Sequence, residues 1–215
     1  AGLAWKSAAA AAAAGVLLTL ALRWVSPPTS AFMIGHHLEG NAVDYRWVPL
    51  SRISPNAALA VIASEDQNFF RHRGIDLEAI EDAIQDNRRR ALPRGASTIS
   101  QQTVKNLFLW PGRSYLRKGI EAGFTLLAEA LWPKRRILEI YLNIVEMGRG
   151  VFGVEAAARR FFGKPAADLT RREAATLAAV LPGPEKMFAD RPSDYVQRRA
   201  RWIMKFTAGQ PCLAC

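Results

Sequence analysis

The chain has 215 residues, enough for one domain of ordinary size with a short appendage. Half of the residues are hydrophobic, so a full-sized core can form, and the only two cysteines, Cys212 and Cys215, exclude a framework of disulfides. The formal net charge of +10 indicates an anionic partner such as phosphate, anionic lipid head groups or nucleic acid.

The first segment is apolar. Residues 7–22, SAAAAAAAGVLLTLAL, carry no charge, and the apolar character continues through Trp24 and Val25. This stretch is close to the ~20 residues that a helix needs to cross a bilayer. A cleaved signal peptide places small residues after its apolar run, whereas here the alanines come first. The sequence therefore predicts an uncleaved transmembrane anchor within residues 1–26, with a cleaved signal peptide or a buried helix as alternatives.

A connector is predicted over residues 27–53. It contains a short apolar patch, AFMIG, at residues 31–35, which is too short to span a membrane. The patch belongs either to the core or to the membrane interface. We expect the folded domain over residues 54–210, followed by a tail at 211–215.

From Ser54 onward the sequence contains residues typical of helix starts and ends. Ser54 is an N-cap residue followed by Pro55, and both Thr98-x-x-Gln101 and Thr170-x-x-Glu173 fit the capping box. Alternation typical of strands is scarce. The sequence predicts a mainly α fold, with further helices after Ser114, after Pro133, over 153–162 with a stop at Gly163, and over 193–206.

The excess positive charge is concentrated between Arg88 and Arg136. This segment contains eleven Lys or Arg and two acids, Glu121 and Glu129, and so carries +9. The anionic partner is therefore expected to bind here. The bases are Arg88, Arg89, Arg90, Arg94, Lys105, Arg113, Arg117, Lys118, Lys134, Arg135 and Arg136.

Glu65 is the first candidate for chemistry. It follows the helix predicted from Pro55, it precedes Asp66, and Phe69 and Phe70 lie just beyond. The helix dipole, the neighbouring charge and loss of water to the phenylalanines all disfavour the ionised form. A carboxylate tuned in this way suits general acid–base catalysis. The alternative is a structural ion pair with a nearby arginine or a bond to the backbone.

A second candidate region is RGASTISQQTVKN, residues 94–106. The free N–H groups of its capped helix start favour anions, and Gln101 and Lys105 share a helical face. The alternative is that Gln101 only completes the cap and Lys105 is solvated.

The third region is RSYLRKGIE, residues 113–121. Arg117 and Glu121 are four residues apart, and Arg113 lies just before the helix. Here Glu121 either orients the surrounding cations for a phosphate or holds a divalent cation beside it. The alternative is an ordinary surface ion pair.

Taken in order, these stretches resemble the peptidoglycan glycosyltransferase family, especially its monofunctional membrane-anchored members. The matching patterns are E-D-x-x-F-x-x-H-x-G from Glu65, G-x-S-T-x-x-Q-Q from Gly95, R-K-x-x-E from Arg117, K-x-x-I-L-E-x-Y-L-N from Lys134 and a weaker block from Glu173. The resemblance covers residues 43 to about 207.

The resemblance implies a lysozyme-like, two-lobed helical domain with a catalytic cleft. It implies that lipid II is polymerised into β-1,4-linked glycan by inverting transfer, with release of undecaprenyl diphosphate. By residue, it implies Glu65 as general base and Glu121 as the second required carboxylate, with Asp66 and His72 supporting the site. The substrate-binding residues that it implies are Ser97, Gln101, Gln102, Lys105, Arg113 and Arg117.

The resemblance also sets expectations for partners and place. The expected partners are lipid II, the growing glycan chain and other cell-wall synthesis or division proteins. The expected location is the bacterial inner membrane, with the catalytic domain facing the periplasm. No cofactor is required, although Mg²⁺ or Mn²⁺ at the diphosphate fits the family. The transpeptidase motifs S-x-x-K and K-T-G are not found in the sequence, so we expect polymerisation without peptide cross-linking.

Two other functions remain open at this stage. A lysozyme-like glycan-cleaving enzyme would also use carboxylates, but it protonates a sugar leaving group and has no need of Lys105, Arg113 and Arg117. A non-catalytic, membrane-tethered basic protein would bind anionic lipid or nucleic acid. Binding to nucleic acid is not expected, because the basic segment shows no known docking motif and only scattered aromatics.

Overall fold

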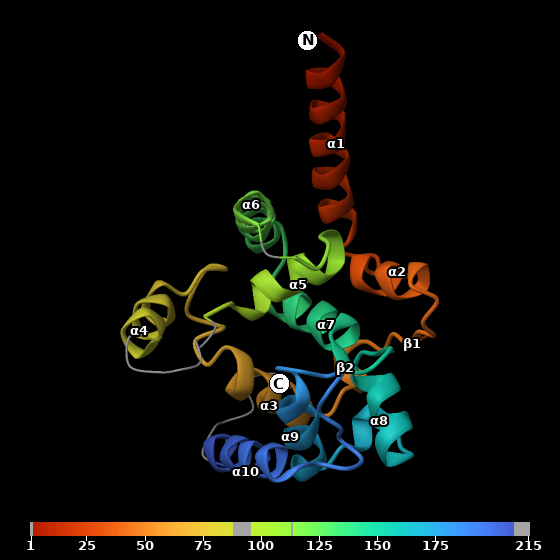
Figure 1. Cartoon of the computed structure of the whole chain (residues 1–215), viewed down its shortest axis with the longest axis vertical. Coiled ribbons are helices and arrows are strands. Elements are labelled where there is room, and N and C mark those ends of the chain that lie inside the picture. Colours follow the sequence, from red (N-terminus) through yellow and green to blue (C-terminus); the bar gives the residue numbers. More distant parts are fainter. Residues whose placement is uncertain (1, 88–95, 113, 209–215) are drawn as a thin grey trace.

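The computed structural model describes residues 2–87, 96–112 and 114–208 (Figure 1). Among the residues singled out above, Gly95, Arg113, Cys212 and Cys215 lie outside these ranges, as do the arginines at 88–90 and 94.

The protein is mainly helical, as predicted. The helices are α1 (Gly2–Ala21), α2 (Ala31–Leu38), α3 (Pro55–Glu65), α4 (Leu77–Asn87), α5 (Ile99–Phe108), α6 (Tyr115–Leu131), α7 (Lys134–Ile144), α8 (Val154–Phe162), α9 (Arg171–Val180) and α10 (Asp194–Thr207). Two short 3-10 helices span Leu50–Arg52 and Ala166–Asp168.

A small sheet was not anticipated from the sequence. It consists of β1 (Asp44–Tyr45), β2 (Glu146–Gly148) and β3 (Val151–Phe152) in the order β1-β3-β2. The β1 and β3 strands run parallel, with Asp44 opposite Val151, whereas β2 and β3 are antiparallel. Strands of two or three residues are too short to produce a visible alternation of side chains, which explains the omission.

The predicted helix starts are largely confirmed. Both capping boxes form: the Thr98 hydroxyl accepts the N–H of Gln101, and Thr170 and Glu173 pair in the same way. The Ser114 hydroxyl caps α6. Ser54 precedes α3 as expected, but its hydroxyl donates to the carbonyl of Leu169 at 2.9 Å instead of capping the helix.

The helix α7 lies at the centre of the core. Its apolar residues Ile137, Leu138, Tyr141 and Leu142 are fully buried, and α5, α6 and α8 pack around it. Two polar residues of the same helix, Glu139 and Asn143, fix the preceding connector: Glu139 accepts the N–H of Leu50 at 2.8 Å, and the Asn143 amide bonds both backbone groups of Val48.

The N-terminal helix α1 extends away from the rest of the molecule (Figure 1). Its carboxyl-terminal end is attached to the body, because the Trp132 indole donates to the Thr19 carbonyl at 2.7 Å and Arg136 donates to the carbonyls of Leu22 and Val25. Within the residues described here, no helix has the length and apolar character needed to span a membrane. The transmembrane anchor therefore stays a prediction.

The connector is an integral part of the folded body. Its AFMIG patch forms the first part of α2, where Met33 is buried in the core while Ile34 and, further along, Leu38 are exposed. The following residues Asp44 and Tyr45 form β1 and so join the sheet. The prediction that the patch belongs to the core is confirmed for Met33.

Candidate active site

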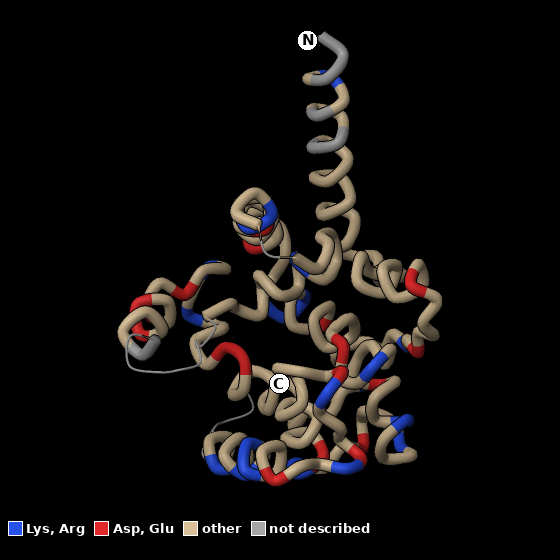
Figure 2. The backbone as a smooth tube through the Cα atoms, viewed as in Figure 1, with Lys and Arg blue, Asp and Glu red and all other residues tan. Residues whose placement is uncertain are grey.

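A cleft of about 990 Å³ opens at the carboxyl end of α3. The last residues of α3 and the first of α5 form one side of it. Acidic residues of α4 and basic residues of α10 form opposing parts of its lining, and Figure 2 shows these two charge types on the two helices. The lining includes Ser64, Glu65, Glu78, Asp82, Ser97, Gln102, Tyr195, Arg198, Arg199 and Trp202.

Glu65 reaches this cleft from the end of α3, with 14% of its side chain exposed. Polar groups contact its carboxylate. The Ser64 hydroxyl lies 2.9 Å from Oε1, the Gln102 amide donates to Oε2 at 3.1 Å, and Arg199 Nη2 lies 3.4 Å from Oε1.

These surroundings differ from the apolar setting expected for Glu65. The Phe69 ring is instead fully buried, with the Lys134 ammonium 4.5 Å from its centroid, and Phe70 stacks edge-on against it. Glu65 therefore has three polar groups against its carboxylate where the sequence suggested apolar neighbours. These contacts hold both carboxylate oxygens in a defined orientation.

A hydrogen-bond relay orients the amide of Gln102. The Tyr141 hydroxyl donates to Gln102 Oε1 at 2.9 Å, which leaves Nε2 to face Glu65. Burial, followed by the negative charges of Glu65 and Asp66, raises the pKa of Tyr141 well above its usual value, so the phenol keeps its proton and remains a donor. Sequence reasoning missed Tyr141, since its apolar helical position marked it only as core.

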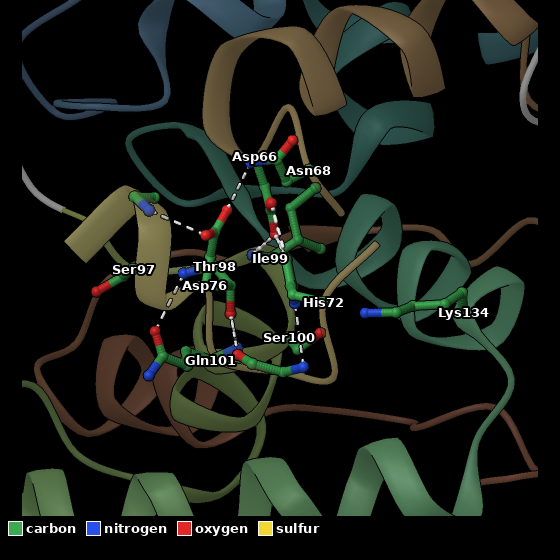
Figure 3. Close-up of polar contacts among 12 residues, drawn as sticks. Asp66, Asn68, His72, Asp76, Ser97, Thr98, Ile99, Ser100, Gln101 and Lys134 are labelled. Atoms are coloured by element: carbon green, nitrogen blue, oxygen red, sulfur yellow. Dashed lines mark hydrogen bonds and ion pairs between the residues drawn. The ribbon is translucent and has the colours of Figure 1, made fainter. Parts of the chain in front are cut away.

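Asp66 and His72 fix the loop that follows Glu65 (Figure 3). Both Asp66 oxygens lie within 3.0 Å of His72 Nε2, and one of them also accepts the N–H of Ile99 at 2.9 Å. The N–H of Gly74 donates to His72 Nδ1, so Nε2 carries the ring proton. This geometry ties the end of α3 to the start of α5 and is that of structural support.

Gly74 is required in this loop for conformational reasons. Its φ of +90° lies in the region that favours glycine, and a Cβ there would lie 2.8 Å from Thr125 Cγ2. Its carbonyl accepts the Thr98 hydroxyl at 2.6 Å. The loop is thus closed against α5 and α6 by contacts that leave no room for a side chain.

Lys105 lies one turn beyond Gln102 on α5. Its ammonium is 5.3 Å from the centroid of the Phe32 ring and makes no hydrogen bond or ion pair with the described residues. Burial lowers the pKa of Lys105, and the carboxylates of Glu121 and Glu65 oppose that shift. A partly dehydrated cation within electrostatic reach of both carboxylates is suited to binding an anion.

Glu121 forms a buried cluster with two cations of α6. Only 2% of the residue is exposed, Arg117 Nη1 lies 2.6 Å from its Oε2, and Lys118 Nζ lies 2.5 Å from its Oε1. The buried Nε of Arg117 has no hydrogen-bond partner among the described residues. The burial rules out an ordinary surface pair, and the geometry is that of an acid that orients cations.

The remaining predicted binding residues have three different placements. Ser97 and Gln102 line the cleft together with Glu65. Gln101 is buried, and its Oε1 accepts the N–H of Thr98 at 3.1 Å, so it completes the cap and is not part of the cleft lining. Arg113 lies outside the described residues.

One group of possible metal ligands adjoins the cleft. Oxygen or nitrogen atoms of Asp66, His72 and Asp76 lie within 4.8 Å of one another. The oxygens already accept hydrogen bonds, since Asp76 receives the Asn68 amide at 3.1 Å and the N–H of Ala79 at 2.9 Å. The existing bonds account for this arrangement without a metal ion.

Comparison with known proteins assigns the chain to a family. A family model described as Transglycosylase matches residues 33–207. Three relatives carry the name biosynthetic peptidoglycan transglycosylase. The protein from Rhodospirillum centenum is 56% identical over 189 residues, covering 87% of this chain and 82% of the relative. That from Xanthomonas campestris is 52% identical over 201 residues, covering 90% and 82%. That from Caulobacter vibrioides is 48% identical over 192 residues, covering 89% and 84%. The chain therefore belongs to the transglycosylase family, and its relatives there are peptidoglycan transglycosylases.

Proposed function

We propose that this protein is a peptidoglycan glycosyltransferase that polymerises lipid II into β-1,4-linked glycan and releases undecaprenyl diphosphate. One observation carries the proposal: α5 connects a cleft carboxylate, Glu65, to a dehydrated cation, Lys105, beside the buried cluster of Arg117 and Glu121. The names of the relatives support the same activity.

In the proposed reaction, Glu65 is the general base. It accepts the proton of the acceptor's 4-hydroxyl as that oxygen attacks the anomeric carbon of the donor sugar. The new carbon–oxygen bond forms as the bond to the diphosphate breaks, and the configuration at the anomeric carbon inverts. Each carboxylate oxygen has two lone pairs, so bonding to Gln102 leaves Oε2 able to accept this proton.

The leaving group is already a dianionic or trianionic diphosphate, which needs stabilisation of charge more than a proton. Lys105 and Arg117 supply that charge in the proposal, with Arg113 as a further contact. Glu121 acts by holding Arg117, while Ser97 and Gln102 line the donor side. Gln101 contributes through the cap of α5.

A divalent ion held by Glu121 does not fit the residues present. The carboxylate oxygens lie 2.6 Å from Arg117 Nη1 and 2.5 Å from Lys118 Nζ, and these two positive charges repel a divalent cation. The mechanism proposed here therefore assigns Glu121 to the protein's own cations and uses no metal ion.

The proposed location is the bacterial inner membrane, with the catalytic domain facing the periplasm. Apolar side chains support it, because they are exposed on α1, on the residues after it, and on α2 and α6 around its base (Figure 1). They are Val16, Leu17, Leu18, Trp24, Val25, Ile34, Leu38, Leu116 and Leu126. Attachment there would bring a lipid-linked substrate to the cleft. The prediction that α1 spans the membrane is part of this proposal.

The test supplies the purified protein with labelled lipid II and separates the products by length. Glycan polymer and undecaprenyl diphosphate are expected, without cross-linked peptides. Cleavage of finished peptidoglycan with no turnover of lipid II would instead identify a hydrolase. Binding of lipid II or anionic vesicles without any product would identify a non-catalytic protein.

A further inference from the structure

Arg199 of α10 reaches the carboxylate of Glu65 from a distant part of the chain. Its Nη2 lies 2.8 Å from Ser64 Oγ, 3.3 Å from the Ser64 carbonyl oxygen and 3.4 Å from Glu65 Oε1. The side chain is 24% exposed and lines the cleft. One guanidinium nitrogen therefore contacts both of the last two residues of α3.

The placement of Arg199 is set by the packing of α10. Val196, Ala200 and Ile203 of the same helix are buried, and α10 packs against both α9 and α3. The Nε of Arg199 is buried with no hydrogen-bond partner in the described part of the chain. A buried donor left unpaired costs free energy, so the hydrogen bonds of Arg199 within the fold do not fully account for its position.

Ser64 couples Arg199 to Glu65 a second time. Its hydroxyl accepts from Arg199 and has a single proton to donate, with Glu65 Oε1 at 2.9 Å and the Ala178 carbonyl at 3.2 Å as acceptors. Because the hydroxyl receives a charged donor, it is polarised towards its own acceptor. The shorter distance favours Glu65.

We propose that Arg199 is a positioning residue for glycosyl transfer: with Ser64 it holds Glu65 Oε1 and so leaves Oε2 beside Gln102 to accept the proton. The inference rests on the proposed role of Glu65 as general base. Arg199 differs in this from Arg201, which is exposed on the same helix and is not part of the cleft lining.

Other charged and titratable groups lie near Glu65 or line the same cleft. They are Asp66 beside it, Lys105 of α5, Tyr141 of α7, Asp76, Glu78 and Asp82 at or on α4, and Tyr195 and Arg198 of α10. Arg199 is the one cation among the described residues that forms an ion pair with Glu65. Its removal should therefore disturb the orientation of the Glu65 carboxylate most directly.

The test measures kcat and KM for labelled lipid II with Arg199→Gln, Arg199→Lys and the matched control Arg201→Gln. We expect Arg199→Gln to lower kcat about tenfold with little change in KM, because the carboxylate loses its fixed orientation while the substrate contacts remain. Arg199→Lys should recover part of the lost kcat, and Arg201→Gln should match the wild type.

Other results would overturn the inference. A raised KM with unchanged kcat would show that Arg199 binds substrate directly. Equal behaviour of Arg199→Gln and Arg201→Gln would show that it has no such role. If Arg199→Gln does not fold, Ser64→Ala replaces it; a smaller fall in kcat is then expected, and an unchanged kcat would contradict the inference.

Glu65→Gln, measured beside these variants, separates this inference from the proposed mechanism. An inactive Glu65→Gln with an unaffected Arg199 series would refute only the role of Arg199. Full activity of Glu65→Gln would refute the general base itself.

Discussion

Replacing Tyr141 by phenylalanine tests whether the relay to Glu65 orients the catalytic carboxylate. The change deletes one oxygen atom from a fully buried side chain and leaves Gln102 Oε1 without its donor at 2.9 Å. The ring itself can keep its packing. Gln102 then loses the contact that distinguishes the two ends of its amide, and a turned amide would present its oxygen to Glu65.

The magnitude follows from this single hydrogen bond. A buried hydrogen bond between neutral groups contributes about 1 kcal/mol to stability, and Gln102 is only partly buried, so water can replace part of the loss. We expect a fall of about 1 kcal/mol in the free energy of unfolding. If the same free energy is lost in the transition state, kcat falls about fivefold.

The assay combines thermal unfolding with lipid II turnover. Tyr45→Phe is the matched control, because the Tyr45 hydroxyl donates to the Pro27 carbonyl at 2.6 Å and is not part of the cleft lining. That control should lose stability but keep kcat. A double-mutant cycle of Tyr141→Phe with Gln102→Ala should give a coupling energy of about 1 kcal/mol in kcat. Additive effects, or an unchanged kcat in Tyr141→Phe, would refute the orienting role.

Two further predictions concern the cationic side of the site. Because burial lowers the pKa of Lys105, its ammonium loses its proton at a lower pH than an ordinary lysine at 10.5. Diphosphate binding should therefore weaken as pH rises towards that value, and the KM for lipid II should rise. Lys105→Arg should remove this pH dependence of KM. Lys105→Ala should lose most activity at every pH. An alkaline KM profile shared by wild type and Lys105→Arg would contradict the assignment. Glu121→Gln leaves the buried Arg117 guanidinium without its counter-ion and should cost about 3 kcal/mol of unfolding free energy together with severe loss of activity. Normal thermal unfolding and turnover in this variant would show that the buried cluster has no such role.

Features encoded by neighbouring residues could be predicted from the sequence. The capping boxes at Thr98 and Thr170 and the start of α3 at Pro55 depend on residues at most three positions apart, and all three were found. The buried stripe of α7 depends in the same way on residues a few positions apart, at the spacing of one helical face.

Features that depend on contacts between distant segments could not be predicted from the sequence. Arg199 is 134 residues from Glu65 in the sequence, and Tyr141 is 39 residues from Gln102, yet each pair is in contact. Nothing in their local sequence distinguishes them from a solvated arginine and a core tyrosine. The prediction of apolar surroundings for Glu65 was wrong for the same reason. The donors to its carboxylate come from three different helices, whereas the two phenylalanines are near Glu65 in sequence but do not surround it.

The most direct test of the central claim is turnover of labelled lipid II by Glu65→Gln. The substitution keeps the size of the side chain but removes its ability to take a proton at neutral pH. General base catalysis contributes about 10²- to 10⁴-fold, so kcat should fall by at least about a hundredfold while thermal unfolding stays near that of the wild type. Polymer formed at close to the wild-type rate would contradict the assignment of Glu65 as the base.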